Sequence, residues 1–321
     1  MEREYNKVYC DNWLNNNLPD KCAKLLICDP PYFEVKGEFD FIWKTFEDYL
    51  KDVEKWAIEC KRVLADNGTL FWWGMDRKIA YTQIILDKYF YLIGTPVWEK
   101  PSNPNEWDTR RTFPERGAER LLMYSAVEES LNITECVFYI RDYIRAEIIK
   151  SKGKIVLKHV NEALGTATNG GGVASACLSL DKKEPAMITK EMYEILQKWC
   201  NPNLSKTYEY LRKEYEDLRQ EFEYKRRYFK NEFGLTDIMR FARENNNYEH
   251  DTKKPEKLTR ALILTCSRKD DLVVVPFAGS GTECAMSVKE GRNFIGFDIE
   301  NKYVEMSNGR CFEIQRQPQL F

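Results

Sequence analysis

Residues 272–282 read Leu-Val-Val-Val-Pro-Phe-Ala-Gly-Ser-Gly-Thr, and this stretch decides the fold class. Four apolar residues predict a buried strand, the glycines predict a tight turn, and residues 283–290 predict the helix that follows. About 20 positions after Gly279, a strand over residues 294–297 ends in Asp298. A glycine turn lets a ligand approach the backbone, and a distal acid can accept hydrogen bonds from ribose hydroxyls. Because the third glycine of a dinucleotide fingerprint is missing, the pattern favours a smaller ligand that contains one nucleoside.

A second apolar stretch, residues 24–28, ends directly in Asp29-Pro30-Pro31-Tyr32. Prolines stop regular structure, so a strand followed by a turn would explain this segment without any function. A carboxylate, two rigid prolines and an aromatic ring at the end of a strand also suit the binding of a flat heteroaromatic amine such as a nucleobase. Asp11 follows a short strand at residues 7–9 and has the same two interpretations, a turn residue or a functional acid.

Strands and helices alternate in the first 126 residues. The spacing predicts an amphipathic helix from about residue 43 to 64, ending before Asn67-Gly68, and a second helix at 79–88. Strands are expected at 69–73, 91–98 and 121–124. This alternation predicts an α/β fold with a mainly parallel sheet and helices on both faces.

Composition excludes several classes of protein. The chain has 321 residues, 43% of them hydrophobic and 31% charged, which is typical of a globular protein. A net charge of −2 means that any contact with nucleic acid must come from local basic patches. Ten cysteines without a C-x-x-C pair, and two histidines, indicate neither a zinc site nor a disulfide framework. With no apolar leader and no apolar run of about 20 residues, we expect a cytoplasmic protein without a membrane span.

The character of the chain changes near residue 141. Predicted helices at 143–152, 156–164 and 173–180 surround a glycine-rich turn at 165–172, which resembles a helix-turn-helix, although small three-helix packings without DNA look the same. A long helix at 207–230 has aromatic residues seven apart, a seam that could pair two copies into a homodimer or pack on its own domain. We therefore expect a core at 1–140 and 246–321 with a mostly helical insertion at 141–245.

Basic residues in three places are candidates for contact with DNA phosphates. The alternatives are a solvated loop between residues 100 and 120 paired with neighbouring acids, and a basic helix end that complements the helix dipole. The candidates are Arg110, Arg111, Arg116, Lys158, Lys225, Arg226 and Arg227.

Together, Asp29-Pro-Pro-Tyr32 and Phe277-Ala-Gly-Ser-Gly281 resemble the two signature motifs of amino-group DNA methyltransferases that use S-adenosylmethionine. Their order, with the catalytic motif first and the cofactor motif last, resembles the permuted β class of that family. The resemblance covers about residues 5–126 and 248–312 and implies a seven-stranded Rossmann-like sheet with an inserted target-recognition domain. It implies methyl transfer to adenine N6 in double-stranded DNA, as in restriction-modification systems. Cytosine N4 is the near alternative, and a non-catalytic helix-turn-helix regulator is the alternative from another class.

The same resemblance assigns roles to residues. Asp29, Pro30, Pro31 and Tyr32 would hold a flipped-out base, with no metal required. The family usually has Asp-Pro-Phe where this chain has Val275-Pro276-Phe277, which would shift one polar contact to Lys254 or Thr282. The last five residues, Gln317–Phe321, resemble a peptide that binds the replication sliding clamp, or form a frayed tail. Contacts to S-adenosylmethionine are expected from Asp11, Asp29, His250, Lys254, Pro255, Phe277, Gly279, Ser280, Gly281, Thr282 and Asp298.

Overall fold

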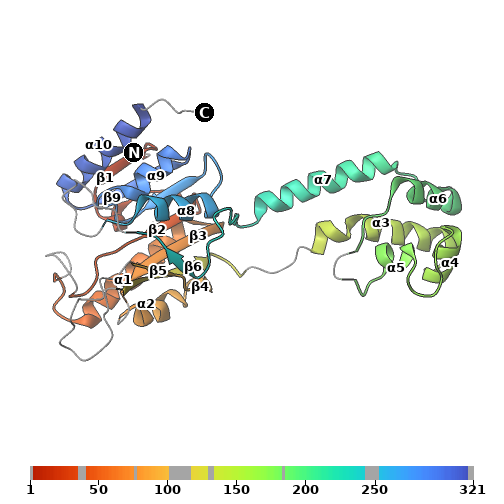
Figure 1. The fold of residues 1–321 in the computed structure, drawn as a ribbon, viewed down its shortest axis with the longest axis horizontal. Coiled ribbons are helices and arrows are strands. Elements are labelled where there is room, and N and C mark those ends of the chain that lie inside the picture. Colours follow the sequence, from red (N-terminus) through yellow and green to blue (C-terminus); the bar gives the residue numbers. More distant parts are fainter. Residues whose placement is uncertain are drawn as a thin grey trace. The chain divides into compact units, whose positions relative to one another are not determined.

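The chain forms two compact units in the computed structural model, residues 1–129 with 227–321 and residues 130–226 (Figure 1). The structure describes residues 3–34, 41–75, 78–100, 117–128, 134–182, 185–242 and 253–316. Both boundaries of the insertion differ from those predicted at 140/141 and 245/246. Residues 227–242 belong to the first unit because they carry a three-residue strand, too short to recognise in the sequence, that joins the sheet of that unit.

The first unit is built on one sheet of nine strands in the order β1-β9-β8-β2-β3-β6-β5-β7, with β4 paired to β6. Strand β6 is antiparallel to β3, β4 and β5, and the remaining pairs are parallel. The predicted α/β fold with a mainly parallel sheet is confirmed, with nine strands in place of the expected seven. The strands are β1 (Lys7–Cys10), β2 (Ala23–Cys28), β3 (Leu64–Gly74), β4 (Tyr91–Gly94), β5 (Val97–Glu99), β6 (Ala118–Ser125), β7 (Ile238–Arg240), β8 (Leu272–Val275) and β9 (Asn293–Asp298).

The strand expected at residues 91–98 is in fact two strands. β4 pairs with the end of β6 and β5 with its start, and Thr95-Pro96 separates them. Proline has no N–H to donate to a neighbouring strand, so a single strand cannot run through this position without losing a ladder bond. The Pro96 carbonyl still accepts a hydrogen bond from the Leu121 amide at 2.9 Å.

Helices cover both faces of the sheet, as predicted (Figure 1). Side chains alternate along β2, so that Leu26 and Cys28 join the core under α1 (Phe46–Val63) and α2 (Ile79–Leu86). Leu25 and Ile27 point to the other face and join the core under α8 (Glu256–Cys266), α9 (Thr282–Lys289) and α10 (Asn301–Arg316). All four side chains are at most 1% exposed, as expected for a strand buried on both faces.

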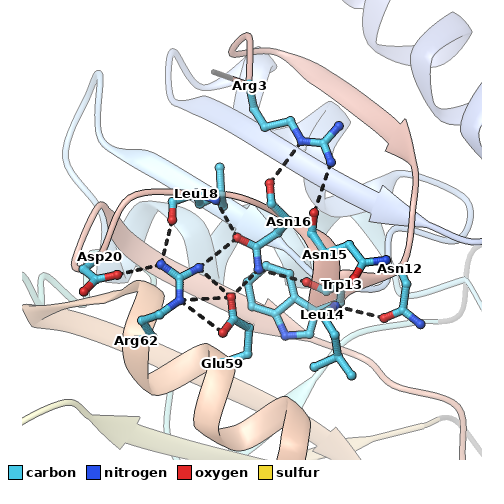
Figure 2. A network of polar contacts seen from close by, with 10 residues as sticks. All are labelled: Arg3, Asn12, Trp13, Leu14, Asn15, Asn16, Leu18, Asp20, Glu59 and Arg62. Atoms are coloured by element: carbon cyan, nitrogen blue, oxygen red, sulfur yellow. Dashed lines mark hydrogen bonds and ion pairs between the residues drawn. The ribbon is translucent and has the colours of Figure 1, made fainter. Parts of the chain in front are cut away.

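The connection from β1 to β2 contains a short 3-10 helix, η1 (Trp13–Asn15). Arg62 of α1 binds the residues of this connection that follow η1. The Arg62 guanidinium donates to the Leu18 carbonyl at 2.7 Å and to Asn16 Oδ1 at 3.2 Å, and it pairs with Asp20 and with Glu59 (Figure 2). Arg3 holds the other side of the same segment through the carbonyls of Asn15 and Asn16 (Figure 2). These contacts fix the segment that begins at the carboxyl end of β1.

The second unit contains only helices among its described residues and has its own apolar core. Its helices are α3 (Thr134–Lys152), α4 (Leu157–Ala163), α5 (Val173–Leu178), α6 (Lys190–Cys200) and α7 (Tyr208–Lys225). Leu211 of α7 is fully buried in this core, whereas Tyr224 near the helix end is 67% exposed. The first half of the predicted seam therefore packs on its own unit, and the helix ends at Lys225 rather than at residue 230.

The glycine-rich turn between α4 and α5 is organised by one buried amide. Asn161 Oδ1 accepts hydrogen bonds from the Ala174 amide at 2.8 Å and from Thr166 Oγ1 at 3.0 Å. A Cβ at Gly172 would lie 2.1 Å from the Ala167 carbonyl oxygen, so a side chain has no room there. The expected helix, turn and short helix are thus present, and their role as a DNA-binding helix-turn-helix stays a prediction.

Candidate functional site

The candidate site lies at one edge of the sheet, where four adjacent parallel strands end. In the order β1-β9-β8-β2, these strands end at Asp11, at Asp298, at the glycine turn 277–282 and at Asp29. The chain passes from β8 to β9 in one direction along the sheet and from β2 to β3 in the other. Open α/β sheets bind their ligands at such a switch point, outside the carboxyl ends of the strands. Here the switch point lies between the glycine turn and Asp29.

Asp29 is held by two side chains in a mostly buried cluster. Its Oδ1 accepts a hydrogen bond from Tyr32 Oη at 2.5 Å, and its Oδ2 accepts one from Lys254 Nζ at 2.5 Å. Lys254 is 3% exposed and Asp29 is 24% exposed, so the carboxylate keeps access to the surface of the site. The Lys254 ammonium also lies 3.2 Å from Glu119 Oε2 and 5.0 Å from the centre of the Trp73 ring.

The electrostatics of this cluster fix its protonation. Burial lowers the pKa of Lys254, but Asp29 and Glu119 outweigh it and raise that pKa well above its ordinary value. Burial, followed by the Asp29 and Glu119 charges, raises the pKa of Tyr32. At neutral pH Lys254 is therefore an ammonium and Tyr32 a neutral phenol, and both donate hydrogen bonds to the Asp29 carboxylate.

The glycine turn 277–282 needs its glycines for steric reasons. Gly281 has φ +70°, and a Cβ there would lie 2.6 Å from Cβ and Oγ of Ser307 on α10. Ser307 Oγ donates in turn to the Gly279 carbonyl at 2.8 Å. Arg310 donates to the Ser280 carbonyl at 3.1 Å and to Thr282 Oγ1 at 3.0 Å. The turn is thus shaped by side chains of the C-terminal helix.

Asp298 at the end of β9 is held by backbone amides from both sides. Gly279 N donates to its Oδ2 at 2.8 Å, and Glu300 N donates to its Oδ1 at 2.9 Å. Burial raises the pKa of Asp298, and the two amides oppose this shift. The fixed carboxylate suits the acceptance of hydroxyl hydrogen bonds from a sugar.

The remaining expected cofactor residues within the described part of the chain lie around the same edge. Phe277 packs its ring against Trp56 with a centroid distance of 5.0 Å. The Asp11 amide donates to the Asp298 carbonyl at 3.0 Å, and a hydrogen bond from Arg3 at 2.6 Å lowers the pKa of Asp11. Pro255 is the N-cap of α8, directly after Lys254. His250 lies outside the described residues.

Within the described residues, the predicted DNA contacts are divided between the two units. Arg110, Arg111 and Arg116, like Gln317–Phe321, lie outside the described residues. Lys225 and Arg226 pair with Glu221 and Glu223 on α7, at 2.5 and 3.1 Å, and Lys158 is exposed on α4. These three belong to the second unit, while Arg227 belongs to the first and donates to Thr69 Oγ1 at 3.4 Å.

Two charged residues of the site, Glu119 and Glu283, were not predicted from the sequence. Glu119 at the start of β6 pairs with Lys254 and with Lys100. Glu283 in the first turn of α9 is 7% exposed, and burial, followed by the Asp29 charge, raises its pKa to about 7. A lone charged residue beside a strand, or an acid in the first turn of a helix, is usual at a surface, so no sequence signal marks these positions.

Neither a metal site nor a membrane span is found among the described residues. No group of three or more His, Cys, Asp or Glu side chains is arranged there to hold a metal ion. Within the same residues, no helix is both long enough and apolar enough to cross a bilayer.

The family model described as DNA methylase matches residues 23–309, which is most of the chain, so the protein belongs to the DNA methylase family. The family resemblance seen in the sequence, to the β class of amino-group DNA methyltransferases, is thereby confirmed. The family includes enzymes that methylate adenine N6 and enzymes that methylate cytosine N4.

Individual relatives agree with this membership. The chain is 24% identical over 324 residues to the type II methyltransferase M.HinfI of Haemophilus influenzae, covering 94% of this chain and 66% of that protein. It is 24% identical over 295 residues to the DNA adenine methyltransferase YhdJ of Escherichia coli K12, covering 90% and 76%. The chain thus spans just under two thirds of the length of M.HinfI.

A solved structure shows the same fold. TTHA0409 from Thermus thermophilus, assigned as a DNA modification methylase and complexed with S-adenosyl-L-methionine, aligns with a TM-score of 0.52 at 16% identity. The alignment covers 97% of this chain and 96% of that one.

Proposed function

We propose that this protein is a site-specific DNA adenine-N6 methyltransferase, which transfers a methyl group from S-adenosylmethionine to a flipped-out adenine in duplex DNA. The observation that carries the proposal is the meeting of Asp29 and the glycine turn 277–282 at the ends of the adjacent strands β2 and β8. One side of this switch point offers a carboxylate for an amine, and the other offers a turn for a nucleoside cofactor. Membership of the DNA methylase family supports the same reaction.

S-adenosylmethionine is the cofactor, and the residues at the turn fit it. Asp298, oriented by the amides of Gly279 and Glu300, is placed to accept hydrogen bonds from ribose hydroxyls. The space that a Cβ would fill at Gly281 is taken by Ser307, so the turn bends tightly beside the methionine end of the site. When bound, the cofactor supplies an electrophilic methyl group on a sulfonium centre. Asp11, on the strand next to Asp298, is assigned to the adenine ring.

On the other side of the switch point, the residues act by positioning the target amine. An exocyclic amine is a weak nucleophile because its lone pair is delocalised into the ring. Asp29 accepts one N–H of the amine and the Pro30 carbonyl accepts the other, which favours a pyramidal nitrogen with its lone pair directed at the methyl group. Tyr32 packs on the base. Pro30 and Pro31 keep the constellation rigid, and alignment of this kind supplies most of the rate.

DNA recognition is assigned to the helical unit, residues 130–226, because the base must leave the duplex to reach Asp29 and the flanking sequence must be read elsewhere. Lys158, Lys225, Arg226 and Arg227 are assigned to phosphate contacts, together with Arg110, Arg111 and Arg116. Replacing Lys158 with glutamine should weaken binding to all DNA sequences alike and lower its salt dependence, because phosphate contacts carry no sequence information.

Adenine is favoured over cytosine by the aspartate at the first position of Asp29-Pro-Pro-Tyr32 and by the relative YhdJ, named a DNA adenine methyltransferase. Cytosine N4 is the second candidate because the matching family includes both activities. Digestion of DNA methylated by the purified protein, followed by mass spectrometry of the nucleosides, separates N6-methyladenine from N4-methylcytosine. Only N4-methylcytosine in the digest would overturn the adenine assignment.

A test of the mechanism uses Asp29→Ala. We expect no detectable methyl transfer, while the affinity for S-adenosylmethionine measured by calorimetry stays within about tenfold, because Asp29 acts mainly on the amine. Glu99→Gln, in an exposed ion pair with Arg240, is a matched control that should keep full activity. Activity in the alanine variant would refute the role of Asp29. Absence of cofactor binding by the wild-type chain would favour the non-catalytic DNA-binding regulator instead.

A further inference from the structure

Lys254 lies between two carboxylates and is bound to them unequally. Its Nζ donates to Asp29 Oδ2 at 2.5 Å, whereas the 3.2 Å contact with Glu119 Oε2 is an ion pair. Within the described part of the chain, the buried Glu119 Oε2 has no hydrogen-bond partner of good geometry. A buried acceptor without a hydrogen bond costs free energy, and the Lys254 ammonium lies 3.2 Å from this one. Glu119 is therefore a second acceptor for the same lysine.

Strand topology explains how Glu119 reaches this place. β6 runs antiparallel to β3, so its first residues lie at the carboxyl end of β3, the edge where Asp29 also sits. Lys100, just after β5, pairs with Oε1 of Glu119, while Lys254 contacts Oε2. The four groups Lys100, Glu119, Lys254 and Asp29 form a chain of alternating charge whose net charge is zero.

In this arrangement Asp29 is engaged at both oxygens, by Tyr32 and by Lys254. An ammonium in such close contact draws electron density from the carboxylate and makes it a poorer acceptor for another N–H. The target amine therefore gains a better acceptor when Lys254 shifts toward Glu119. Without a second carboxylate, the shift would leave a buried ammonium poorly compensated, which is costly.

We propose that Glu119 is a positioning residue that acts through Lys254: it accepts the ammonium when the target amine binds, so that Asp29 becomes available to that amine. The proposal rests on the proposed methyltransferase function and extends it to a residue that touches neither the base nor the cofactor. Glu119→Gln then lowers kcat by about 10- to 100-fold, the range expected when reacting groups are misplaced. Its KM for S-adenosylmethionine changes by less than about threefold, because the glycine turn is unaffected.

The pH profile separates this role from a merely structural one. The charged groups that face Lys254 are Asp29 after β2, Glu119 on β6 and Glu283 on α9, and burial opposes the effect of these carboxylates on its pKa. Removing the Glu119 charge lowers the pKa of Lys254, so kcat of Glu119→Gln falls toward the alkaline end of the range up to about pH 10, whereas the raised pKa of Lys254 in the wild type keeps kcat constant there. Glu119→Asp keeps the charge at a greater distance and gives an intermediate kcat and an intermediate alkaline limb.

The experiment measures transfer of labelled methyl groups to DNA from about pH 6 to about pH 10 for the wild type, Glu119→Asp and Glu119→Gln, with Glu99→Gln as the control on neighbouring β5. The expected order of kcat and of the alkaline limbs is wild type, Asp, Gln, with Glu99→Gln equal to the wild type. Thermal unfolding checks that each variant is folded. If Glu119→Gln is not folded, Glu119→Asp alone decides, and a kcat equal to that of the wild type across the pH range overturns the inference.

Folded Glu119→Gln with the wild-type kcat and pH profile also overturns the inference while leaving the proposed function intact. A wild-type protein that binds S-adenosylmethionine and transfers no methyl group to DNA overturns the proposed function itself.

Discussion

Replacing Gly281 with alanine should destabilise the protein by about 2 to 5 kcal/mol, from two separate costs. The backbone has φ +70°, and holding a residue with a Cβ in this left-handed region costs about 1–2 kcal/mol. The new Cβ would also lie 2.6 Å from Ser307 Cβ and Oγ and 2.9 Å from Ser307 Cα, and overpacking of this kind costs about 1–3 kcal/mol. Ser307 cannot easily yield, because it belongs to α10 and its hydroxyl is bonded to the Gly279 carbonyl.

The measurement is urea unfolding of the full chain, with Gly234→Ala as the matched control. Gly234 also has a left-handed backbone, φ +58°, but nothing lies within 4 Å of its added Cβ. The control should therefore lose only about 1–2 kcal/mol, and the difference between the variants isolates the contact with α10. Calorimetry should show weaker binding of S-adenosylmethionine for Gly281→Ala alone. Equal losses within about 0.5 kcal/mol, with unchanged cofactor affinity, would refute the steric account of this turn.

Three other outcomes follow from the structure. Burial and the Asp29 charge raise the pKa of Glu283 from 4.5 to about 7, so the folded state binds this proton more tightly than the unfolded state. The stabilisation from this proton is fully present below pH 4.5, and the free energy of unfolding falls by up to about 3 kcal/mol as the pH rises to 7. Glu283→Gln should remove this loss and exceed the wild type in urea-unfolding stability at about pH 8 but not at pH 4.5; equal stabilities at the higher pH would contradict the burial argument. Asp298→Asn should lower the affinity for S-adenosylmethionine about 10- to 100-fold in calorimetry, since a charged acceptor becomes neutral. An unchanged affinity would show that Asp298 does not bind the cofactor. Arg62→Gln should cost about 1–3 kcal/mol in urea unfolding by releasing the segment after β1, whereas Arg212→Gln, which loses only one ion pair within α7, should cost less than about 0.5 kcal/mol.

The central fold could be predicted because its signals are local. The apolar runs at residues 25–28 in β2 and 272–275 in β8 are uninterrupted, which is typical of strands buried on both faces, and the amphipathic spacing of α1 predicted one covering helix. Strand β7 could not be predicted, and β5 could not be separated from β4, because β5 and β7 have three residues each and acquire strand structure only by pairing with a neighbour. Because β7 could not be recognised, the sequence placed residues 227–242 in the insertion, whereas the structure places them in the first unit.

The candidate site, like the fold, could be predicted only in part from the sequence. The sequence by itself determined Asp29-Pro-Pro-Tyr32 and the glycine turn, because a rigid turn and a left-handed backbone require particular residue types at particular spacings. Only the tertiary structure decided which charges meet there. Asp29 and Lys254 are 225 positions apart, and Glu119 joins them through an antiparallel strand. Ion pairs depend on distance in space and on burial, and a sequence records neither until the order and direction of the strands are known.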